Sequence, residues 1–267
     1  EFTGSLSGAG HTISALAVNV DRNVTEGLFG DVDGSTVSGL TLENPTITSG
    51  NDSGVDGNQV FGEGVTLAGD VTLNAGSGAV SIDQPIGTSA SPAGVIRVTG
   101  GRMSLPAVTS SGRQIYTATE SITLTADLAT GGTEIQFDGP VLLGADIAID
   151  TADGDVANTG NIWFASTVDS QTTARNLTLT TGSGSVSFDG AVGDVSELNL
   201  LRLYTLNNIT FSDTVQLQSL FQQARGSGQF RLDGTLTSTS RDLTINTTTL
   251  ALTAPVLTSG GNVSITA

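Results

Sequence analysis

Short runs in which apolar and polar residues alternate recur from one end of the chain to the other. Clear examples are Val71-Thr72-Leu73, Leu177-Thr178-Leu179 and Leu243-Thr244-Ile245. Successive side chains on a β-strand point to opposite faces, so each run predicts a short strand that buries one face. Gly, Ser, Thr, Asn and Asp cluster between the runs and predict tight turns. The pattern therefore favours an all-β protein.

A short motif also recurs, in which two apolar residues flank three positions whose middle residue is usually small. Phe137-Asp138-Gly139-Pro140-Val141 and Phe188-Asp189-Gly190-Ala191-Val192 are two copies. The chain contains eleven copies, one of them a residue shorter, and the last six follow one another at intervals of 20 to 27 residues. Longer units repeat as well, because residues Val71–Gly87 and Leu177–Gly193 align without a gap. A strand-and-turn unit that recurs in this way predicts a repeat protein whose units stack along an axis.

We predict a right-handed, single-stranded parallel β-helix, a solenoid, of about eleven rungs with a period of roughly 20–27 residues. No rung can bury its apolar face alone, whereas stacking at the inter-strand spacing of about 4.8 Å gives a continuous core. A leucine-rich repeat fits poorly, because no helical pattern follows the strands. A β-sandwich has the same strand composition and is the competing fold, but it does not require one motif to recur so regularly.

Two intervals between copies of the motif are longer than the rest. One starts at Leu28 and covers 33 residues, and the other starts at Leu105 and covers 32 residues. We interpret both as insertions, and we expect residues 51–58 and Ser110–Arg113 to form surface loops that leave the coil. Such loops are where the functional residues of a rigid scaffold concentrate.

The first apolar position of the motif holds a large side chain in consecutive copies. Equivalent positions of neighbouring rungs lie above one another, so we predict a stack of these side chains inside the coil, with an exposed sugar-binding aromatic strip as the alternative. The predicted core stack consists of Phe137, Phe164, Phe188, Phe211, Leu232 and Leu252. The next position is acidic in several copies, and we expect these carboxylates to face solvent: Asp83, Asp138, Asp189 and Asp233.

The composition removes several classes of function. Asp and Glu number 26 against nine basic residues, all of them arginine, for a formal net charge of −17. Nucleic-acid binding needs clustered Lys and Arg, so we expect no nucleic-acid partner. The chain has no cysteine, which excludes disulfides and thiolate chemistry. No apolar run reaches the roughly 18 residues that a membrane span requires, and the apolar content of 37% suffices for a core.

Residues typical of active sites are scarce. The only histidine, His11, lies in a Gly-rich turn, and no Gly-x-Ser-x-Gly motif is present for a serine nucleophile. Pectin-degrading β-helices use Asp-Asp, Gly-His-Gly and Arg-x-Lys motifs, none of which occurs here. We therefore expect no enzymatic activity. The alternative is a β-helix that binds or cleaves carbohydrate, for which the predicted contact residues are Arg97, Arg102, Arg113 and Tyr116.

Calcium is the one cofactor for which the sequence offers ligands. Ca²⁺ prefers carboxylate and carbonyl oxygens, and several Asp-rich turns resemble fragments of calcium loops. The candidate ligands are Asp31, Asp33, Asp52, Asp56, Asp153 and Asp155. No turn has the complete spacing of a calcium loop with its closing Glu, and the nonapeptide of calcium-binding β-rolls does not occur. We expect no cofactor, with weak calcium binding at these turns as the exception.

Two stretches, Asn176–Val186 and Gly260–Thr266, resemble the degenerate repeats of filamentous-haemagglutinin-type exoproteins. These are large bacterial surface adhesins, many of which are exported by two-partner secretion. Gly27-Leu28-Phe29-Gly30, followed by Val37–Leu42, is similar to the Gly-Leu-Phe-Gly repeats of related surface proteins. The Asn-Pro motif of that family's secretion domain is not matched, because Asn44-Pro45 has a different context.

The resemblance implies one β-helix segment, residues 1–267, of a longer secreted or surface chain. We divide it into Gly-Leu-Phe-Gly-like rungs at 1–75, irregular rungs with loops at 76–120 and regular haemagglutinin-like rungs at 121–267. The predicted function is a non-enzymatic rod or stalk of an extracellular or cell-surface bacterial adhesin or fibre. Its expected partners are neighbouring repeats of the same chain, like subunits, and surface glycans or host-cell receptors. A self-assembling filament subunit is a further alternative.

Overall fold

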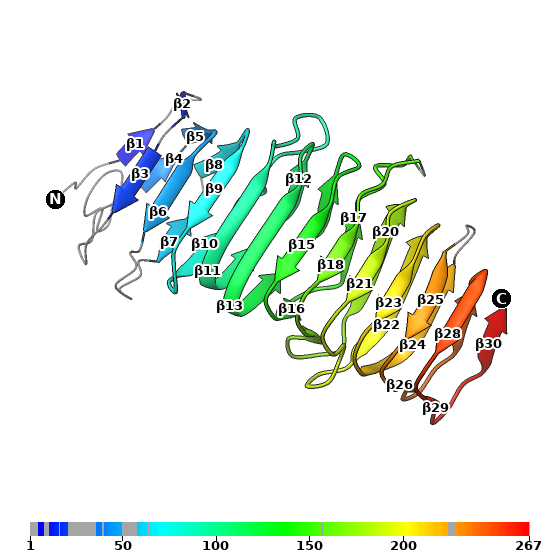
Figure 1. Ribbon diagram of the computed structural model, residues 1–267. Helices are drawn as coiled ribbons and strands as arrows, with labels where there is room; N and C mark the ends of the chain where they lie inside the picture. The colour runs from blue at the N-terminus through cyan, green and yellow to red at the C-terminus, as the bar shows by residue number, and fades with distance from the viewer. Residues whose placement is uncertain are drawn as a thin grey trace.

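The computed structural model describes residues 5–7, 11–15, 17–20, 36–38, 40–49, 58–62, 65–155, 157–223 and 228–266. These residues form thirty β-strands and no helix, and the strands pair in parallel. Figure 1 shows them stacked side by side along one axis from the N-terminal to the C-terminal end. The chain is therefore a parallel β-helix of about ten turns, which confirms the fold predicted from the repeat.

Each turn of the coil passes through three faces, which we call the first, second and third face. The first face is built from β3 (Ala17–Val20), β6 (Thr46–Ser49), β9 (Val71–Asn74), the first parts of β11 (Ile96–Leu105) and β13 (Gln114–Leu124), β15 (Ile135–Asp138), β18 (Ile162–Phe164), β21 (Val186–Phe188), β23 (Ile209–Phe211), β25 (Gln229–Leu232) and β28 (Thr249–Leu252).

The second and third faces complete the coil. The second face contains β7 (Gln59–Phe61), β10 (Ala79–Ile82), the later parts of β11 and β13, β16 (Val141–Leu143), β19 (Val168–Ser170), the start of β24 (Val215–Gln223), β26 (Leu236–Ser238) and β29 (Val256–Thr258). The third face contains β12 (Val108–Ser110), β14 (Leu128–Thr130), β17 (Ile147–Asp150), β20 (Asn176–Gly182), β22 (Leu198–Thr205), the end of β24, β27 (Leu243–Asn246) and β30 (Val263–Thr266).

Two small sheets lie nearer the N-terminus. One pairs β1 (Ser5–Ser7) with β4 (Thr36–Ser38), and the other joins β2 (Thr12–Ser14), β5 (Leu40–Glu43) and β8 (Val65–Ala68). From Leu40 to Ile245 the inward-facing apolar side chains form a single hydrophobic cluster. The core is therefore a continuous column along the axis. Each fully buried Val, Leu, Ile or Phe in it stabilises the fold by roughly 1.5–3 kcal/mol.

A stack of aromatic rings lies inside the first face. Tyr116, Phe137, Phe164, Phe188 and Phe211 occupy one inward column, with ring centroids 4.8–5.5 Å apart and planes within 20° of parallel. All five side chains are fully buried. The four phenylalanines of the predicted stack therefore lie in the core, and an exposed aromatic strip at this position is excluded.

The same column continues beyond the rings. Leu232 pairs with Phe211 and is completely buried, whereas Leu252 pairs with Leu232 and is 41% exposed. Leu252 was predicted to be a core residue, and this is wrong for the described chain. It lies on β28, the last strand of the first face, so no described strand covers its outer side.

The recurring motif marks two different corners of the coil. From Phe137 onward it joins the first face to the second, because Phe137 lies in β15 and Val141 begins β16. Earlier copies join the second face to the third, because Leu105 ends β11 and Val108 begins β12. The 32-residue interval after Leu105 is thus about one turn plus one face, and its interpretation as an insertion is wrong. A further copy, Leu124-Thr125-Ala126-Asp127-Leu128, continues the earlier series within that interval.

The segment Ser110–Arg113 is a tight turn and not a loop that leaves the coil. Ser110 is buried at the end of β12, its hydroxyl donates to the Gly112 carbonyl at 2.6 Å, and Gln114 begins β13. The other expected loop, residues 51–58, lies outside the described residues apart from Asn58. The expectation of a loop-borne surface at Ser110–Arg113 is therefore corrected.

Two corner glycines occupy equivalent places in the two units that align in the sequence. Gly87 and Gly193 have φ angles of +67° and +71°, a left-handed conformation that glycine adopts without the steric cost of a Cβ. A Cβ atom would overlap the backbone carbonyl of Thr109 at the first position and that of Gln216 at the second. The aligned units nevertheless lie on different faces, since one begins with β9 and the other with β20.

Candidate functional site

The three arginines of the predicted carbohydrate surface do not converge. Arg97 is exposed on the first face, and Arg113 lies beside it because the Arg113 carbonyl accepts a bond from the Ile96 amide at 3.0 Å. Arg102 lies beyond the register shift in β11, on the second face, and pairs with Glu120. The prediction of one contact surface that includes all three arginines is therefore wrong, because β11 bends between two faces.

Tyr116 is not a surface contact. Its side chain is fully buried in the aromatic stack, and its hydroxyl donates to Gln114 Oε1 at 2.9 Å. Burial raises the pKa of the Tyr116 hydroxyl far above its ordinary value, because a phenolate would lose its hydration there. The glycan-contact prediction for Tyr116 is corrected: alternation in β13 turns this side chain inward, onto Phe137.

Two of the calcium candidates can be placed. Asp153 and Asp155 lie in the turn after β17, where Asp153 has a φ of +49° and Asp155 Oδ1 accepts from the Ala157 amide at 2.9 Å. The remaining candidates lie outside the described residues: Asp31, Asp33, Asp52 and Asp56. Within the described ranges, no three His, Cys, Asp or Glu side chains are grouped to hold a metal ion. Calcium binding stays a prediction.

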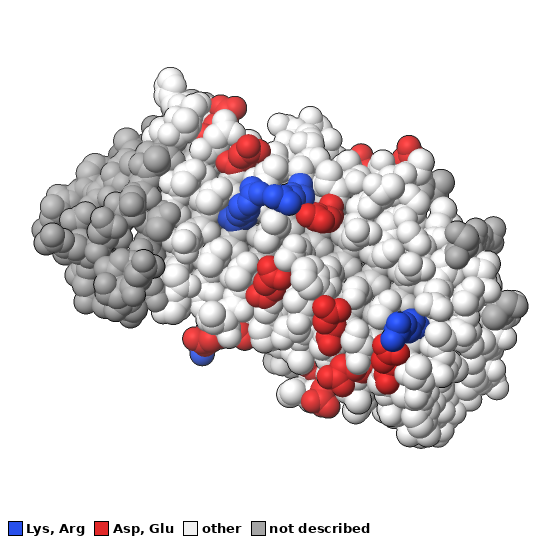
Figure 2. Space-filling view, in the orientation of Figure 1, with Lys and Arg blue, Asp and Glu red and all other residues white. Residues whose placement is uncertain are grey.

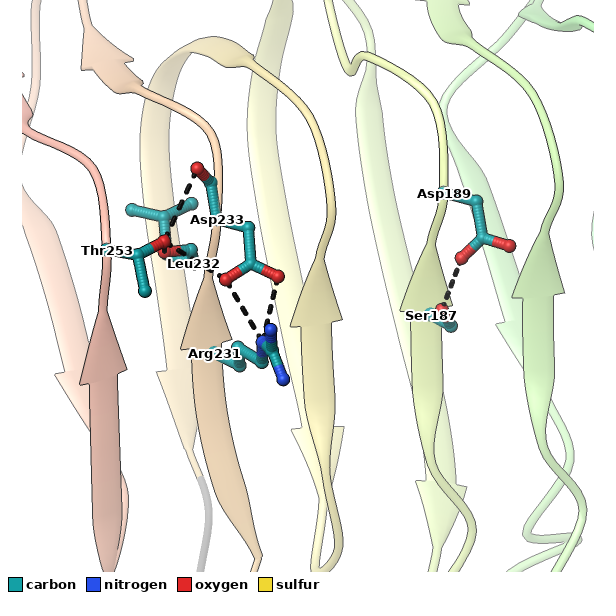
Figure 3. A network of polar contacts seen from close by, with 6 residues as sticks. All are labelled: Ser187, Asp189, Arg231, Leu232, Asp233 and Thr253. Atoms are coloured by element: carbon teal, nitrogen blue, oxygen red, sulfur yellow. Dashed lines mark hydrogen bonds and ion pairs between the residues drawn. The ribbon is translucent and has the colours of Figure 1, made fainter.

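The outer side of the first face carries a repeated polar contact. On three turns the residue before the inward Phe or Leu bonds to the aspartate after it, because side chains two apart on a strand share a face. Gln136 Nε2 donates to both oxygens of Asp138. Figure 3 shows the other two contacts: Ser187 Oγ donates to Asp189 Oδ1 at 2.8 Å, and Arg231 Nε donates to both oxygens of Asp233 at 2.8 and 3.0 Å. These contacts hold each carboxylate against its own strand.

Some of these carboxylates also connect neighbouring turns. Thr253 Oγ1 donates to Asp233 Oδ1 at 3.1 Å and to the Leu232 carbonyl at 3.2 Å (Figure 3). Trp163 Nε1 donates to Asp189 Oδ2 at 2.7 Å, and this residue is 38% exposed on the outer surface. Asp189 and Asp233 therefore accept hydrogen bonds from adjacent turns while they remain on the outer surface, as expected for this acidic position.

The acidic position alternates with neutral residues along the axis. On successive turns of the first face the outward column reads Asp138, Ala165, Asp189, Ser212, Asp233 and Thr253. Two inter-strand spacings separate the carboxylates, about 10 Å, which reduces their repulsion. Asp83 does not belong to this column, because it follows β10 at the corner between the second and third faces. Figure 2 shows that charged groups cover only part of this side and that carboxylates predominate.

A hollow of about 290 Å³ opens on the outer side of the third face. The residues that line it include Asp127, Asp146, Ala148, Asn176, Thr178 and Arg202. These residues come from different turns and are far apart in the sequence. They meet on the surface because β17, β20 and β22 are adjacent in the sheet. We call this hollow the third-face groove. It combines carboxylate and amide acceptors with a guanidinium donor, so it is able to form hydrogen bonds with a polar ligand.

Sequence reasoning missed three outward-facing residues on the first and third faces. Trp163, Arg202 and Phe221 each stand at the polar position of an alternating strand, between residues that point inward. The available signal was a bulky side chain at an outward position where several other turns have Ala, Ser or Thr. Such a residue becomes informative only when the register between turns is known, because its neighbours on the surface belong to other turns.

The ordered strands and corners define a β-solenoid protein with polar outer surfaces. Over 76 residues the chain is 45% identical to halomucin from Haloquadratum walsbyi, a match that covers 27% of this chain and 1% of halomucin. The chain thus spans a very small part of the relative that it matches. No family model matches the chain, and no solved structure matches it. Among the described residues, no helix has the length and apolar character needed to cross a membrane.

Proposed function

We propose that this chain is a structural module, one length of a rod within a secreted or cell-surface protein. The observation that carries the proposal is the uninterrupted core, in which inward columns run from turn to turn between Leu40 and Ile245. Each turn is bonded to its neighbours along the three faces, so load applied along the axis is shared by the backbone ladders and the stacked side chains.

The extracellular location is supported by the partial match to a protein whose name denotes a mucin, a class found at cell surfaces. That relative comes from an archaeon, so a bacterial source stays a prediction. The resemblance to filamentous-haemagglutinin-type repeats adds an adhesive fibre as the finer form of the proposal. In that form the rod spaces or presents binding regions that lie elsewhere in a longer chain.

Stretching single molecules tests the mechanical part of the proposal. With the chain held between two marker domains, we expect a force peak that Phe188→Ala lowers. The ring of Phe188 lies 4.9 Å from that of Phe164 and 4.8 Å from that of Phe211. Its removal leaves a cavity and lowers the free energy of unfolding by about 3–5 kcal/mol. Trp163→Ala is the control, because it removes an aromatic ring from the exposed side of the same face together with one hydrogen bond between turns, and it should lower the force less than Phe188→Ala.

Three results would count against the proposal. The first is unfolding at negligible force, and the second is an equal loss of force in the buried and exposed variants. The third is failure of an antibody against this segment to detect it either on intact source cells or in their culture medium. Concentration-dependent light scattering separates a filament subunit from a monomeric rod, since end-to-end assembly raises the scattering mass while leaving the unfolding peak in place.

A further inference from the structure

The third-face groove exists because short side chains stand between long ones in one outward column. On four successive turns this column reads Asp127, Ala148, Thr178 and Arg202. Ala148 and Thr178 form the floor, while Asp127 and Arg202 stand three inter-strand spacings apart, about 14 Å. A hollow of this length crosses several turns, so it suits an extended ligand better than a single ion.

The acidic side of the groove is held in place by bonds within the protein. Asp127 Oδ1 accepts from the Ala148 amide at 2.7 Å. Asp146 accepts from the backbone amide of Asn176 at 3.0 Å and from its side-chain amide at 2.8 Å. An ionised carboxylate has about four lone-pair sites, so both groups keep acceptor capacity for ligand hydroxyls. Their positions are fixed before any ligand arrives, which lowers the entropic cost of binding.

The opposite end of the groove offers an uncommitted donor beside an apolar surface. Arg202 is exposed and forms no hydrogen bond or ion pair with any residue that the structure describes. Its neighbour in the ladder is Phe221, whose ring lies 6.1 Å from that of Tyr204. Guanidinium donors and aromatic rings side by side suit a ligand that has both hydroxyl groups and apolar C–H faces.

We propose that the third-face groove binds a neutral oligosaccharide. Sugar hydroxyls both donate and accept, so one chain of sugars satisfies the carboxylates at one end and Arg202 at the other. An acidic polysaccharide is disfavoured, because the protein carries a net charge of −17 and the single guanidinium faces two carboxylates. A cationic ligand would gain nothing from Arg202. The rod proposed above does not depend on this groove.

Titration calorimetry on the full chain tests the proposal, with hexasaccharides of glucose, mannose and N-acetylglucosamine as neutral probes and hexagalacturonate as the acidic probe. We expect at least one neutral probe to bind. Arg202→Ala should weaken that binding about tenfold or more, because a charge-assisted hydrogen bond is lost. Thr178→Phe, which fills the floor, should abolish it. Arg97→Ala is the matched control, an exposed mid-strand arginine on the first face, and should leave the affinity unchanged.

Three outcomes would overturn the proposal: no binding of any neutral probe, tighter binding of hexagalacturonate than of every neutral probe, or equal loss in Arg97→Ala and Arg202→Ala. Circular dichroism of each variant shows whether the solenoid is intact. Because these substitutions are on the outer surface, they leave the aromatic stack and the unfolding force untouched, so failure here is distinguishable from failure of the rod.

Discussion

Tyr116 places a hydroxyl at the end of a stack of phenylalanine rings, where water cannot reach it. The hydroxyl donates to Gln114 Oε1, and Gln114 Nε2 donates in turn to Ser110 Oγ at 3.0 Å and to the Ala129 carbonyl at 2.8 Å. A buried polar group that lacks a partner costs about 1–3 kcal/mol. This small network is therefore what allows two polar side chains to occupy inward columns that are otherwise apolar.

The network predicts how stability depends on alkaline pH. Burial raises the pKa of Tyr116 in the folded chain, whereas the unfolded chain ionises this group near its ordinary value of 10.0. The contribution of the neutral Tyr116 hydroxyl to the free energy of unfolding is therefore complete below pH 10. It falls by about 1.4 kcal/mol per pH unit as pH rises further. Tyr116→Phe should be less stable than the parent at pH 8, because Gln114 Oε1 loses its donor, and the difference should shrink above pH 10.

Urea unfolding at pH 8, 10 and 11 measures this difference for the parent and for Tyr116→Phe. Tyr204, the only other tyrosine, is present in both proteins, so its effect cancels. A difference in unfolding free energy that stays constant from pH 8 to pH 11 would show that Tyr116 is not held neutral by the core.

The corners limit which residues can connect one strand to the next. At Gly193 the chain leaves Val192, which bridges Val168 and Val215 on the turns to either side, and passes close to the Gln216 carbonyl. Both the left-handed φ angle and the nearby backbone oppose a Cβ atom there. Gly154 also has a left-handed φ, +73°, but no heavy atom lies within 4 Å of the place its Cβ would take.

This pair of glycines separates backbone strain from steric overlap. Gly154→Ala should cost about 1 kcal/mol for the positive φ alone. Gly193→Ala should cost about 3 kcal/mol or more, because the corner must move away from the next turn as well. Chemical unfolding of both variants measures the two losses. Equal losses would mean that the corner at Gly193 shifts without cost.

The elements were largely predictable from the sequence, because strand alternation and a regular period are local signals. The inward position of Phe137 to Phe211 followed from their equal place in consecutive copies of the motif. Tyr116 was misplaced because the motif of its own turn marks a different corner, so no alignment put it in line with Phe137. Leu252 was wrongly predicted to be buried, because the burial of this side chain requires a following turn that covers it, and the motif does not report whether one is there.

The third-face groove was beyond prediction for a different reason. Asp127 and Arg202 are separated by about three turns in the sequence, one in the corner before β14 and the other within β22. They line one hollow only because Ala148 and Thr178 lie between them in register. Register between turns depends on how many residues each corner takes, and the corners in this chain vary in length.

Across the whole molecule the charge is strongly one-sided, with 26 acidic residues against nine basic ones. Alternation of Asp with neutral residues on the first face reduces the repulsion between neighbouring carboxylates. The folded chain nevertheless holds its acidic groups closer together than the unfolded chain does. The described ion pairs are few and exposed: Arg102–Glu120, Arg113–Glu134 and Arg231–Asp233. Exposed pairs of this kind contribute little, so they do not offset the overall repulsion.

Salt should therefore stabilise the solenoid. Screening shortens the range of repulsion from about 10 Å at 0.1 M to about 3 Å at 1 M salt, and the folded chain brings its charges closer than the unfolded chain does. We expect the urea midpoint to rise between low and molar NaCl. Sucrose, an uncharged stabiliser, is the control for effects on burial alone. A midpoint that falls or stays constant with NaCl would contradict a repulsion-limited fold.

The use of one motif at two different corners bears on how such a chain can grow. A tandem duplication whose ends fall at equivalent corners adds a complete turn and keeps each inward column in line. A duplication between the corner after Leu105 and the corner after Phe137 rotates all following residues by one face. Recombination among similar repeats is therefore filtered by folding, and the surviving length variants should differ by whole turns of the coil.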